Sequence, residues 1–356
     1  MRFHLTQEQS AIQNSLKGAL NDCFPRERLL AFIDEPGDFD RASWETLMGL
    51  GLGGLGLSEA YGGSGLGLLE MALAVETLGF AAAPGPVIGH LLTGLALAAS
   101  ANAEARDRWL AVVTAGRAVA AVAFGGGWLP DSWAVDYRDG MVSGRVPFAQ
   151  GAASATLLLV GIRGGGLALV AAGEGTRVTP LKSADRSRRL GAVEFDRAPA
   201  LQLFVPGDPE TQRIFDAGLV LVAADALGGA QYCTDLSVAY AKERQQFGQA
   251  IGRFQALKHQ LACMALEVEP ARALLWYAAY AHDAQLADAS RSAALAKAHL
   301  CDRYVSVTRA AVAAHGGIGY TWEYGLNIWF RRAAFDRAYL GGPSVHRARA
   351  ADLAAW

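Results

Sequence analysis

Apolar residues recur at helical spacing in the first part of the chain, until Pro25 interrupts the run: Leu5, Ile12, Leu16 and Leu20. Thr6, followed three residues later by Gln9, forms a capping-box pattern that predicts where this helix begins. Two more helical stretches cover 41–50 and 67–78, separated by a glycine-rich segment, and Ala and Leu dominate up to about Gly116. The pattern predicts an all-helical domain over residues 1–116.

The pattern changes after residue 116. Short apolar, β-branched runs alternate with glycine-rich turns, which is typical of strands. The runs cover 118–124, 155–160, 167–170 and 192–195. Among the turns, 163–166 is interpreted as a hairpin turn rather than a phosphate-binding loop. Residues 117–205 are therefore predicted to form a small β domain.

Helical periodicity returns after Pro206. Long segments rich in Ala and Leu cover 211–247, 255–286 and 290–314. Long amphipathic helices of this kind usually pack as an antiparallel bundle, so residues 206–356 are predicted to form a helical-bundle domain. The predicted fold class is mostly α with a small β domain, in the order helices, sheet, helix bundle. This order is uncommon, but by itself it identifies no function.

Composition limits the kind of protein and its partners. With 356 residues, 52% hydrophobic and 19% charged, the chain can bury a large core. Its formal charge of -2 comes from 32 basic and 34 acidic residues without a basic stripe, which argues against a nucleic-acid partner. The N-terminus has no signal pattern, and the apolar stretch 87–99 is too short to span a bilayer. We expect a cytoplasmic protein with no membrane span.

The four cysteines lie far apart in the sequence, with no CxxC pair and no histidine at ligand spacing: Cys23, Cys233, Cys263 and Cys301. We interpret them as reduced, half-buried thiols and expect no metal site.

One apparent dinucleotide motif is a decoy. Gly51, Gly53 and Gly56 match G-x-G-x-x-G, but the residues before them, 43–50, have a helical pattern. A dinucleotide-binding fingerprint must follow a strand and open a helix. The glycines are therefore interpreted as a flexible turn between helices.

Two segments in the last third of the chain could carry chemistry. Arg244 and Phe247 are three residues apart, which places them on one face of a helix that Gly248 would end. Such an arginine could hold a pyrophosphate, with the aromatic ring packed against a flavin or adenine. Spacing alone favours a solvated arginine and a core phenylalanine instead. The second segment contains Gly316, Gly317 and Gly319, which would let a ligand approach the backbone or simply form a tight turn.

Several segments together resemble the acyl-CoA dehydrogenase family. Residues 240–255 are similar to the family pattern YakeRxqFGxxIgxfQ almost letter for letter, and 314–323 are similar to HGGxGyTwE. More weakly, 58–65 resemble pEeyGGsG, followed at the right distance by Glu76 to Gly79 in place of vxEelG. The resemblance extends from Phe3 to the end of the chain.

The resemblance implies an FAD-dependent enzyme that acts on an acyl-CoA thioester. It implies that Arg244, Phe247 and Gln255 lie in a segment that contacts FAD, with the arginine reaching the cofactor of a neighbouring subunit. It also implies that the Gly316–Gly317 backbone, followed by Gly319, approaches the FAD diphosphate from the partner subunit. His315 is then structural or a hydrogen-bond donor rather than a general base. A dimer or a dimer of dimers is expected, with electron-transfer flavoprotein as the electron acceptor.

The sequence departs from the family at the catalytic base. Dehydrogenation needs a carboxylate that removes the α-proton while a hydride leaves the β-carbon. The family's Tyr-Glu-Gly motif corresponds here to Tyr339, Leu340 and Gly341, and the alternative glutamate position aligns with Gly218. Asp216 and Asp336 are nearby in sequence, but both are interpreted as surface carboxylates. The sequence identifies no catalytic residue.

The β domain departs from the family as well. The loop that the family writes TEPxxGSD corresponds to 123–128, which has neither hydroxyls nor acids. The WITN segment corresponds to 148–151, where Phe148 keeps the aromatic and Gln150 replaces the threonine. Ala313 replaces a glutamine that commonly precedes the HGG motif. Phe148 and Gln150 stay candidate flavin contacts.

Four interpretations follow from these departures. The preferred hypothesis is the base-less subunit of a heteromeric dehydrogenase, completed by a glutamate-bearing paralogue, as known in the family for steroid and other bulky acyl-CoA thioesters. The alternatives are a self-sufficient dehydrogenase with an unrecognised base, a flavin oxidase or monooxygenase on the same fold, and a structural protein without flavin. Packing of the acyl cavity decides the acyl group, so the sequence does not name it.

Overall fold

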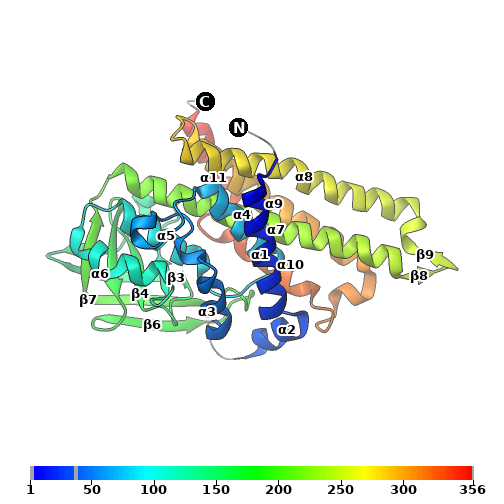
Figure 1. Ribbon diagram of the computed structural model, residues 1–356, viewed down its shortest axis with the longest axis horizontal. Helices are drawn as coiled ribbons and strands as arrows, with labels where there is room; N and C mark the ends of the chain where they lie inside the picture. The colour runs from blue at the N-terminus through cyan, green and yellow to red at the C-terminus, as the bar shows by residue number, and fades with distance from the viewer. Residues whose placement is uncertain (1–3, 36–38, 355–356) are drawn as a thin grey trace. The chain divides into compact units, whose positions relative to one another are not determined.

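The computed structural model describes residues 4–35 and 39–354. Its first part is helical, as predicted (Figure 1). The capping box at the first helix is confirmed: the Thr6 hydroxyl accepts from the Gln9 amide at 3.2 Å, and the Gln9 side chain accepts from the Thr6 amide at 2.9 Å. The six helices of this part are α1 (Gln7–Cys23), α2 (Arg26–Asp34), α3 (Arg41–Gly49), α4 (Leu68–Phe80), α5 (Val87–Ala99) and α6 (Ala103–Thr114).

The glycine-rich segment after α3 forms a turn between helices, as predicted. It contains the short 3₁₀ helices η1 (Leu52–Gly54) and η2 (Glu59–Tyr61). Gly51 adopts a φ of 84°, which only glycine adopts without strain. Because a helix rather than a strand precedes these glycines, the dinucleotide interpretation is excluded.

The middle of the chain forms the predicted sheet. Its strands are β1 (Ala120–Ala123), β2 (Asp136–Arg138), β3 (Met141–Gln150), β4 (Leu157–Ile162), β5 (Gly166–Ala171), β6 (Thr176–Leu181) and β7 (Leu190–Phe204). The order is β1-β4-β5-β7-β3-β2, with β6 also paired to β7, and only the β1–β4 pair is parallel. The predicted hairpin turn at 163–166 is confirmed, since it joins the antiparallel strands β4 and β5.

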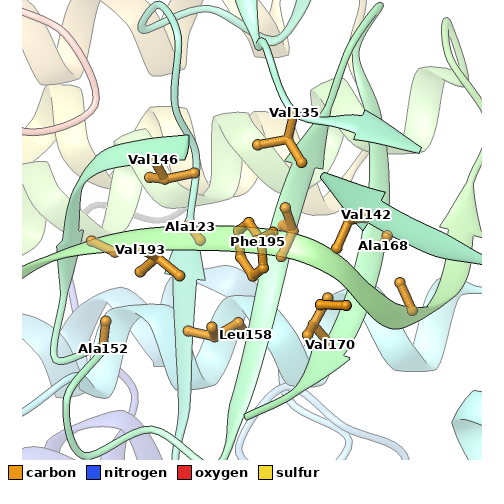
Figure 2. Close-up of a cluster of buried hydrophobic side chains, with 14 of the residues drawn as sticks. Ala123, Val135, Val142, Val146, Ala152, Leu158, Ala168, Val170, Val193 and Phe195 are labelled. Carbon is orange, nitrogen blue, oxygen red and sulfur yellow. The ribbon is translucent and has the colours of Figure 1, made fainter. Parts of the chain in front are cut away.

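One hydrophobic cluster holds this sheet together. Alternate residues of each strand point to the same side, which brings apolar side chains from several strands into contact. Figure 2 shows Val146, Leu158, Val170, Val193 and Phe195 converging in this cluster, and all five are buried. Because a one-residue slip would turn these side chains to the other face of the sheet, their burial fixes the strand register.

The last part of the chain is a set of long helices. They are α7 (Pro209–Glu243), α8 (Gln255–Asp283), α9 (Ala289–His315), α10 (Leu326–Ala338) and α11 (Pro343–Leu353). A short hairpin connects α7 to α8 (Figure 1). Its strands, β8 (Gln245–Gln246) and β9 (Gln249–Ala250), have two residues each, and the 3₁₀ turn η4 (Ile251–Arg253) follows them. A further 3₁₀ turn, η5 (Gly316–Tyr320), follows α9. The order of helices, sheet and helices is as predicted.

The chain forms two compact units that do not follow chain order. The helical unit contains residues up to Asp34, most of α4 with the residues just after it (72–83), and the chain from Val220 onward. The second unit contains Glu35–Met71 and Pro84–Leu219, and therefore the whole sheet. The predicted domain limits, 1–116, 117–205 and 206–356, stay a prediction.

The cysteines are more buried than predicted. Cys23, Cys233 and Cys301 are buried, Cys263 is exposed, and all four are free thiols. Burial raises the pKa of Cys233 and of Cys301, so both stay protonated at neutral pH. The interpretation as half-buried thiols was wrong, because the three buried residues lie on the inward faces of tightly packed helices.

Within the described residues, one helix is long and apolar enough to cross a membrane. This helix is α7, and 94% of its most apolar 18-residue window is buried in the protein. Packing against protein therefore accounts for its apolar composition.

Candidate functional site

The segment with the strongest sequence signal begins where α7 ends. The helix stops at Glu243, four residues earlier than predicted, and Arg244 is the first residue beyond it. Two backbone hydrogen bonds, both 2.9 Å long, hold Arg244 in the connection between α7 and α8. Its amide donates to Tyr240 O, and its carbonyl accepts from the Ile251 amide. The prediction that Arg244 and Phe247 share a helix face was wrong. A hairpin replaces the last turn of the helix and directs the two side chains separately.

Phe247 occupies a turn position that disfavours phenylalanine. Gln246 pairs with Gln249, so Phe247 and Gly248 are the two central residues of the hairpin, with φ of 51° and 76°. Positive φ at both positions defines a tight hairpin turn that favours Asn-Gly or Asp-Gly. The Phe247 side chain is nevertheless 90% exposed. The ring lies edge-on to Phe254, with centroids 6.0 Å apart, and most of its surface is open to a contact outside this chain.

The second glycine-rich segment follows the end of α9. Gly316 adopts a φ of 64°, and a Cβ placed on Gly316 or on Gly317 would meet no atom within 4 Å. The two glycines are exposed and therefore present open backbone to the outside, whereas Gly319 is buried and would place a Cβ 2.8 Å from Val312 O. Gly316 and Gly317 leave room for a ligand, and Gly319 closes the turn.

His315 supports this turn from inside. Its Nδ1 donates to Ala311 O at 2.7 Å, which leaves Nε2 as the unprotonated nitrogen of the neutral ring. Burial lowers the pKa of His315, so the neutral form is favoured. Nε2 is buried and has no hydrogen-bond partner among the described residues. Of the two roles expected for His315, the structural one fits this geometry.

An aromatic cluster joins the two segments. The Tyr240 ring lies one helical turn before Arg244 and packs on the His315 ring, with centroids 4.5 Å apart. Tyr324 also contacts His315, with centroids 5.0 Å apart, and its ring lies 6.2 Å from that of Tyr240. The Arg26 guanidinium lies 4.7 Å from the centroid of the Tyr324 ring. The ends of α7 and α9, about seventy residues apart in sequence, are thereby held together. Sequence reasoning missed Tyr240, Tyr324 and Arg26 because no spacing rule connects them.

These features suit the diphosphate and a ring of FAD. Arg244 is exposed, and within the described ranges its guanidinium makes no side-chain hydrogen bond or ion pair. Gln255 is exposed at the first position of α8. Arginine pairs well with phosphate oxygens, an exposed aromatic ring can stack on a flavin or adenine, and open glycine backbone lets a diphosphate approach. The geometry of the helical unit therefore fits the cofactor predicted from sequence.

In the sheet unit, two segments predicted to face the flavin meet in one small pocket of about 180 Å³. It is lined by 124–128 and by Pro147 and Phe148. A Cβ on Gly125 would lie 2.9 Å from the Val146 side chain, so glycine is required for this approach. Phe148 is half exposed. Gln150 instead is buried, and its Nε2 donates to Gly85 O at 3.0 Å, so its observed role is to hold the loop before α5.

A buried leucine stands at the position of the expected base. Leu340 is 2% exposed and adopts a φ of 56°. His346 Nε2 donates to the Leu340 carbonyl at 2.8 Å, and the buried Lys297 donates to the Gly341 carbonyl at 3.0 Å. Gly218 lies inside α7 and offers no side chain. Neither family position can accept a proton.

The two carboxylates considered as substitutes are not on the surface, so that interpretation was wrong. Asp216 is 3% exposed, and its Oδ1 accepts from Gln212 Nε2 at 3.1 Å. Asp336 is 1% exposed and lies near Tyr304, whose pKa is raised by burial first and then by the neighbouring Cys233 and Asp336. Helix packing buries both because each lies on an inward face of its helix.

Comparison with known proteins agrees with the resemblance seen in the sequence. Residues 6–117 match the family model for the acyl-CoA dehydrogenase N-terminal domain, and residues 210–354 match that for the C-terminal domain. Acyl-CoA dehydrogenase IpdE2 of Mycolicibacterium smegmatis is 28% identical, with 95% of this chain and 96% of that protein aligned. IpdE2 of Mycobacterium tuberculosis is 30% identical, over 86% of this chain and 84% of that protein.

Two further matches are a longer protein and a solved structure. FadE34 of Mycobacterium tuberculosis is 31% identical over 95% of this chain, but the chain spans only 47% of its length. Among solved structures, a chain of the Tcur3481–Tcur3483 steroid ACAD superposes with a TM-score of 0.90 at 31% identity, covering 98% of both chains. The fold, the Arg244 and Gly316–Gly317 segments and these matches agree: the chain belongs to the acyl-CoA dehydrogenase family, FAD-dependent oxidoreductases that act on CH–CH bonds.

Proposed function

We propose that the chain is the base-less subunit of a heteromeric, FAD-dependent acyl-CoA dehydrogenase that acts on a steroid or another bulky acyl-CoA. The observation that carries the proposal is Leu340, a buried leucine at the position of the proton-accepting glutamate, held by hydrogen bonds to its own carbonyl and to that of Gly341. The exposed Arg244, Phe247 and Gly316–Gly317 keep the features that complete a cofactor site. A chain that keeps cofactor contacts but not the base needs a partner that has it.

The proposed reaction divides between two subunits. A glutamate of the partner accepts the α-proton of the thioester, and the electron pair of that C–H bond becomes the new C=C bond. When bound, FAD supplies the acceptor for the hydride from the β-carbon. In this chain, Arg244 would pair with the diphosphate, Phe247 would pack on a ring, and the Gly316–Gly317 backbone would let the diphosphate approach. These residues hold and orient the cofactor and move no proton themselves.

Two relatives support the pairing. The Tcur3481–Tcur3483 steroid ACAD carries the names of two components. FadE34 aligns with this chain over slightly less than half its length, which leaves room for a second region of similar size. Both observations are compatible with an enzyme built from two related chains or halves. The name of the Tcur3481–Tcur3483 steroid ACAD also suggests a steroid acyl group.

The visible absorption spectrum tests the proposal. The chain is purified alone and together with a glutamate-bearing paralogue encoded nearby. We expect a colourless chain alone, and a yellow complex that an acyl-CoA bleaches under anaerobic conditions. Flavin bands in the lone chain that bleach with an acyl-CoA would contradict the proposal and favour a self-sufficient enzyme. Flavin in neither preparation would contradict any dehydrogenase function.

The second candidate is a self-sufficient dehydrogenase, favoured only by the buried carboxylates Asp216 and Asp336. If either were the base, Asp→Asn at that position would lower kcat by several orders of magnitude in a folded protein. We expect Asp216→Asn and Asp336→Asn to leave kcat of the assembled complex within about threefold when thermal melting confirms the fold. Glutamate-to-glutamine substitution at the partner's base should abolish turnover.

Electron-transfer flavoprotein is the proposed electron acceptor, and the cytoplasm is the proposed location. Reduction of electron-transfer flavoprotein by the complex, compared with oxygen consumption, tests the acceptor. Rapid oxygen consumption would instead favour the oxidase or monooxygenase interpretation.

A further inference from the structure

A pocket in the helical unit contains a buried carboxylate oxygen without a partner. The pocket has a volume of about 330 Å³. The glutamate Glu76 lines it from α4, in the segment that resembles the family's vxEelG helix. Glu76 is only 6% exposed. Its Oε1 pairs with Arg272, whereas its Oε2 is buried and has no hydrogen-bond partner among the described residues.

Backbone contacts fix the position of Glu76. A Cβ on Gly228 of α7 would lie 1.8 Å from Glu76 O, and a Cβ on Gly79 of α4 would lie 2.1 Å from Asp225 O. Glycine at both positions lets α4 and α7 touch through their backbones. The backbone of Glu76 is therefore fixed against α7, and the ion pair with Arg272 holds its side chain beside the pocket.

The other charged groups leave the pocket with an excess of negative charge. Arg272 is occupied, because its second Nη donates to Gln231 Oε1 at 3.0 Å and Gln231 in turn donates to Asp235 at 2.8 Å. Glu269 lies 3.8 Å from Arg272 Nε, and Lys17 is exposed at the rim. Three carboxylates thus face two cations. Burial raises the pKa of Glu76 against the opposing effect of Arg272, so one neighbouring cation does not offset the cost of the buried charge.

A group that donates hydrogen bonds and carries positive charge would satisfy this site. A neutral ligand would leave the charge excess, and an anion would be repelled by it. We propose that the Glu76 pocket binds an alkylammonium or guanidinium group, which donates to Glu76 Oε2 and lies near Asp235 at the rim. The cation comes either from a free amine or from a lysine or arginine side chain of an associated protein.

Calorimetric titration with n-butylammonium tests the proposal on the full-length chain, alone and in complex with its partner. We expect saturable binding to the lone chain, no binding of n-butanol, and at least about tenfold weaker amine binding in Glu76→Gln. Glutamine keeps the size and the acceptor for Arg272, and thermal melting checks the fold. Asp235→Asn, at an exposed position, should weaken binding by a few fold without affecting folding. Asp352→Asn, an exposed carboxylate outside the pocket, is the matched control and should change nothing.

The two sources of the cation give different results. If it is a free amine, n-butylammonium binds the lone chain and the complex alike. If it is a side chain of the partner, the complex excludes n-butylammonium, and Glu76→Gln weakens assembly in sedimentation velocity. Absence of amine binding to the lone chain, together with unchanged assembly of Glu76→Gln, overturns the proposal. Since binding to the lone chain requires neither flavin nor catalytic base, this outcome is independent of the proposed dehydrogenase function.

Discussion

Arg332 and Asp225 form a bidentate ion pair in which neither side chain reaches solvent. Arg332 Nε donates to Asp225 Oδ2 at 2.8 Å, and one Nη donates to Oδ1 at 2.6 Å. The other Nη donates to Ala83 O at 3.0 Å, so the pair also ties α10 to the turn that follows α4. All three residues belong to the helical unit. Removing one partner would leave an uncompensated buried charge.

We predict that Arg332→Met lowers the free energy of unfolding by about 3–5 kcal/mol, the range for breaking a buried pair. Asp225→Leu combined with Arg332→Met should recover much of this loss, because neither charge of the pair is then left buried without its partner. Urea unfolding followed by circular dichroism measures both. Arg163→Met is the matched control, since Arg163 pairs with Asp136 at 2.6 Å on the surface and should change stability little. Equal effects of the two single substitutions would contradict the prediction.

Arg244 should be needed for FAD binding but not for folding. We predict that Arg244→Gln weakens FAD binding by the assembled complex about 10- to 100-fold, the effect of losing charge-assisted hydrogen bonds to phosphate. Equilibrium dialysis with flavin fluorescence measures the affinity. Arg253→Gln removes another exposed arginine, nine residues further along the connection between α7 and α8, and should leave the FAD affinity of the complex unchanged. Equal losses in both variants would indicate a general charge effect instead of a specific contact.

Phe247 should lower the stability of its own chain. Phe247→Gly relieves positive φ at the hairpin turn, so we predict that unfolding free energy stays the same or rises by up to about 1 kcal/mol. A buried phenylalanine would behave oppositely and lose about 3–5 kcal/mol on truncation. FAD affinity of the complex should fall, because the exposed ring is gone.

Asp139 offers the control for Phe247. Asp139 and Gly140 join β2 to β3 with φ of 50° and 75°, the same turn geometry as Phe247 and Gly248. Asp139→Gly should therefore alter stability only slightly and leave FAD affinity unchanged. A large loss of stability in Phe247→Gly alone would show that the ring packs within the chain.

Two buried histidines should make stability fall in acid. Burial lowers the pKa of His90 to about 4; burial, with Lys297 nearby, does the same for His346. An unfolded histidine has a pKa near 6.5, so the unfolded chain binds more protons between about pH 6.5 and 4. The contribution of these histidines to the free energy of unfolding should therefore be fully present above pH 6.5 and should be lost as the pH falls toward 4.

Urea unfolding at several pH values measures this dependence, and His90→Gln should reduce its slope. The His90 ring donates from Nε2 to Val113 O at 3.0 Å and accepts the Ala120 amide at Nδ1, a pairing that glutamine can partly reproduce without a titrating group. Substitution of His4, whose side chain is exposed, should leave the slope unchanged. A slope that His90→Gln does not alter would assign the acid sensitivity to other groups.

Local patterns in the sequence predicted most of the fold. Thr6 and Gln9 placed the start of α1, short apolar runs placed β1, β4, β5 and part of β7, and the helix before Gly51 excluded a dinucleotide loop. The runs did not predict β2, β3 and β6. These features depend on neighbours a few residues away, so they can be read from the sequence. The end of α7 was misplaced because a hairpin with Phe247 at positive φ runs against local preference, which is expected where a residue serves a contact outside its own chain.

What the sequence determined by itself was the order of elements, the family and the replacement of the base by Leu340, since each depends only on residue identity along the chain. Tertiary structure decided which distant residues meet. It packed Tyr240 against His315, buried Asp216 and Asp336, paired Arg332 with Asp225, and left one buried oxygen of Glu76 without a partner beside a pocket. Packing of helix faces sets these relationships, and no spacing rule along the chain encodes which faces meet.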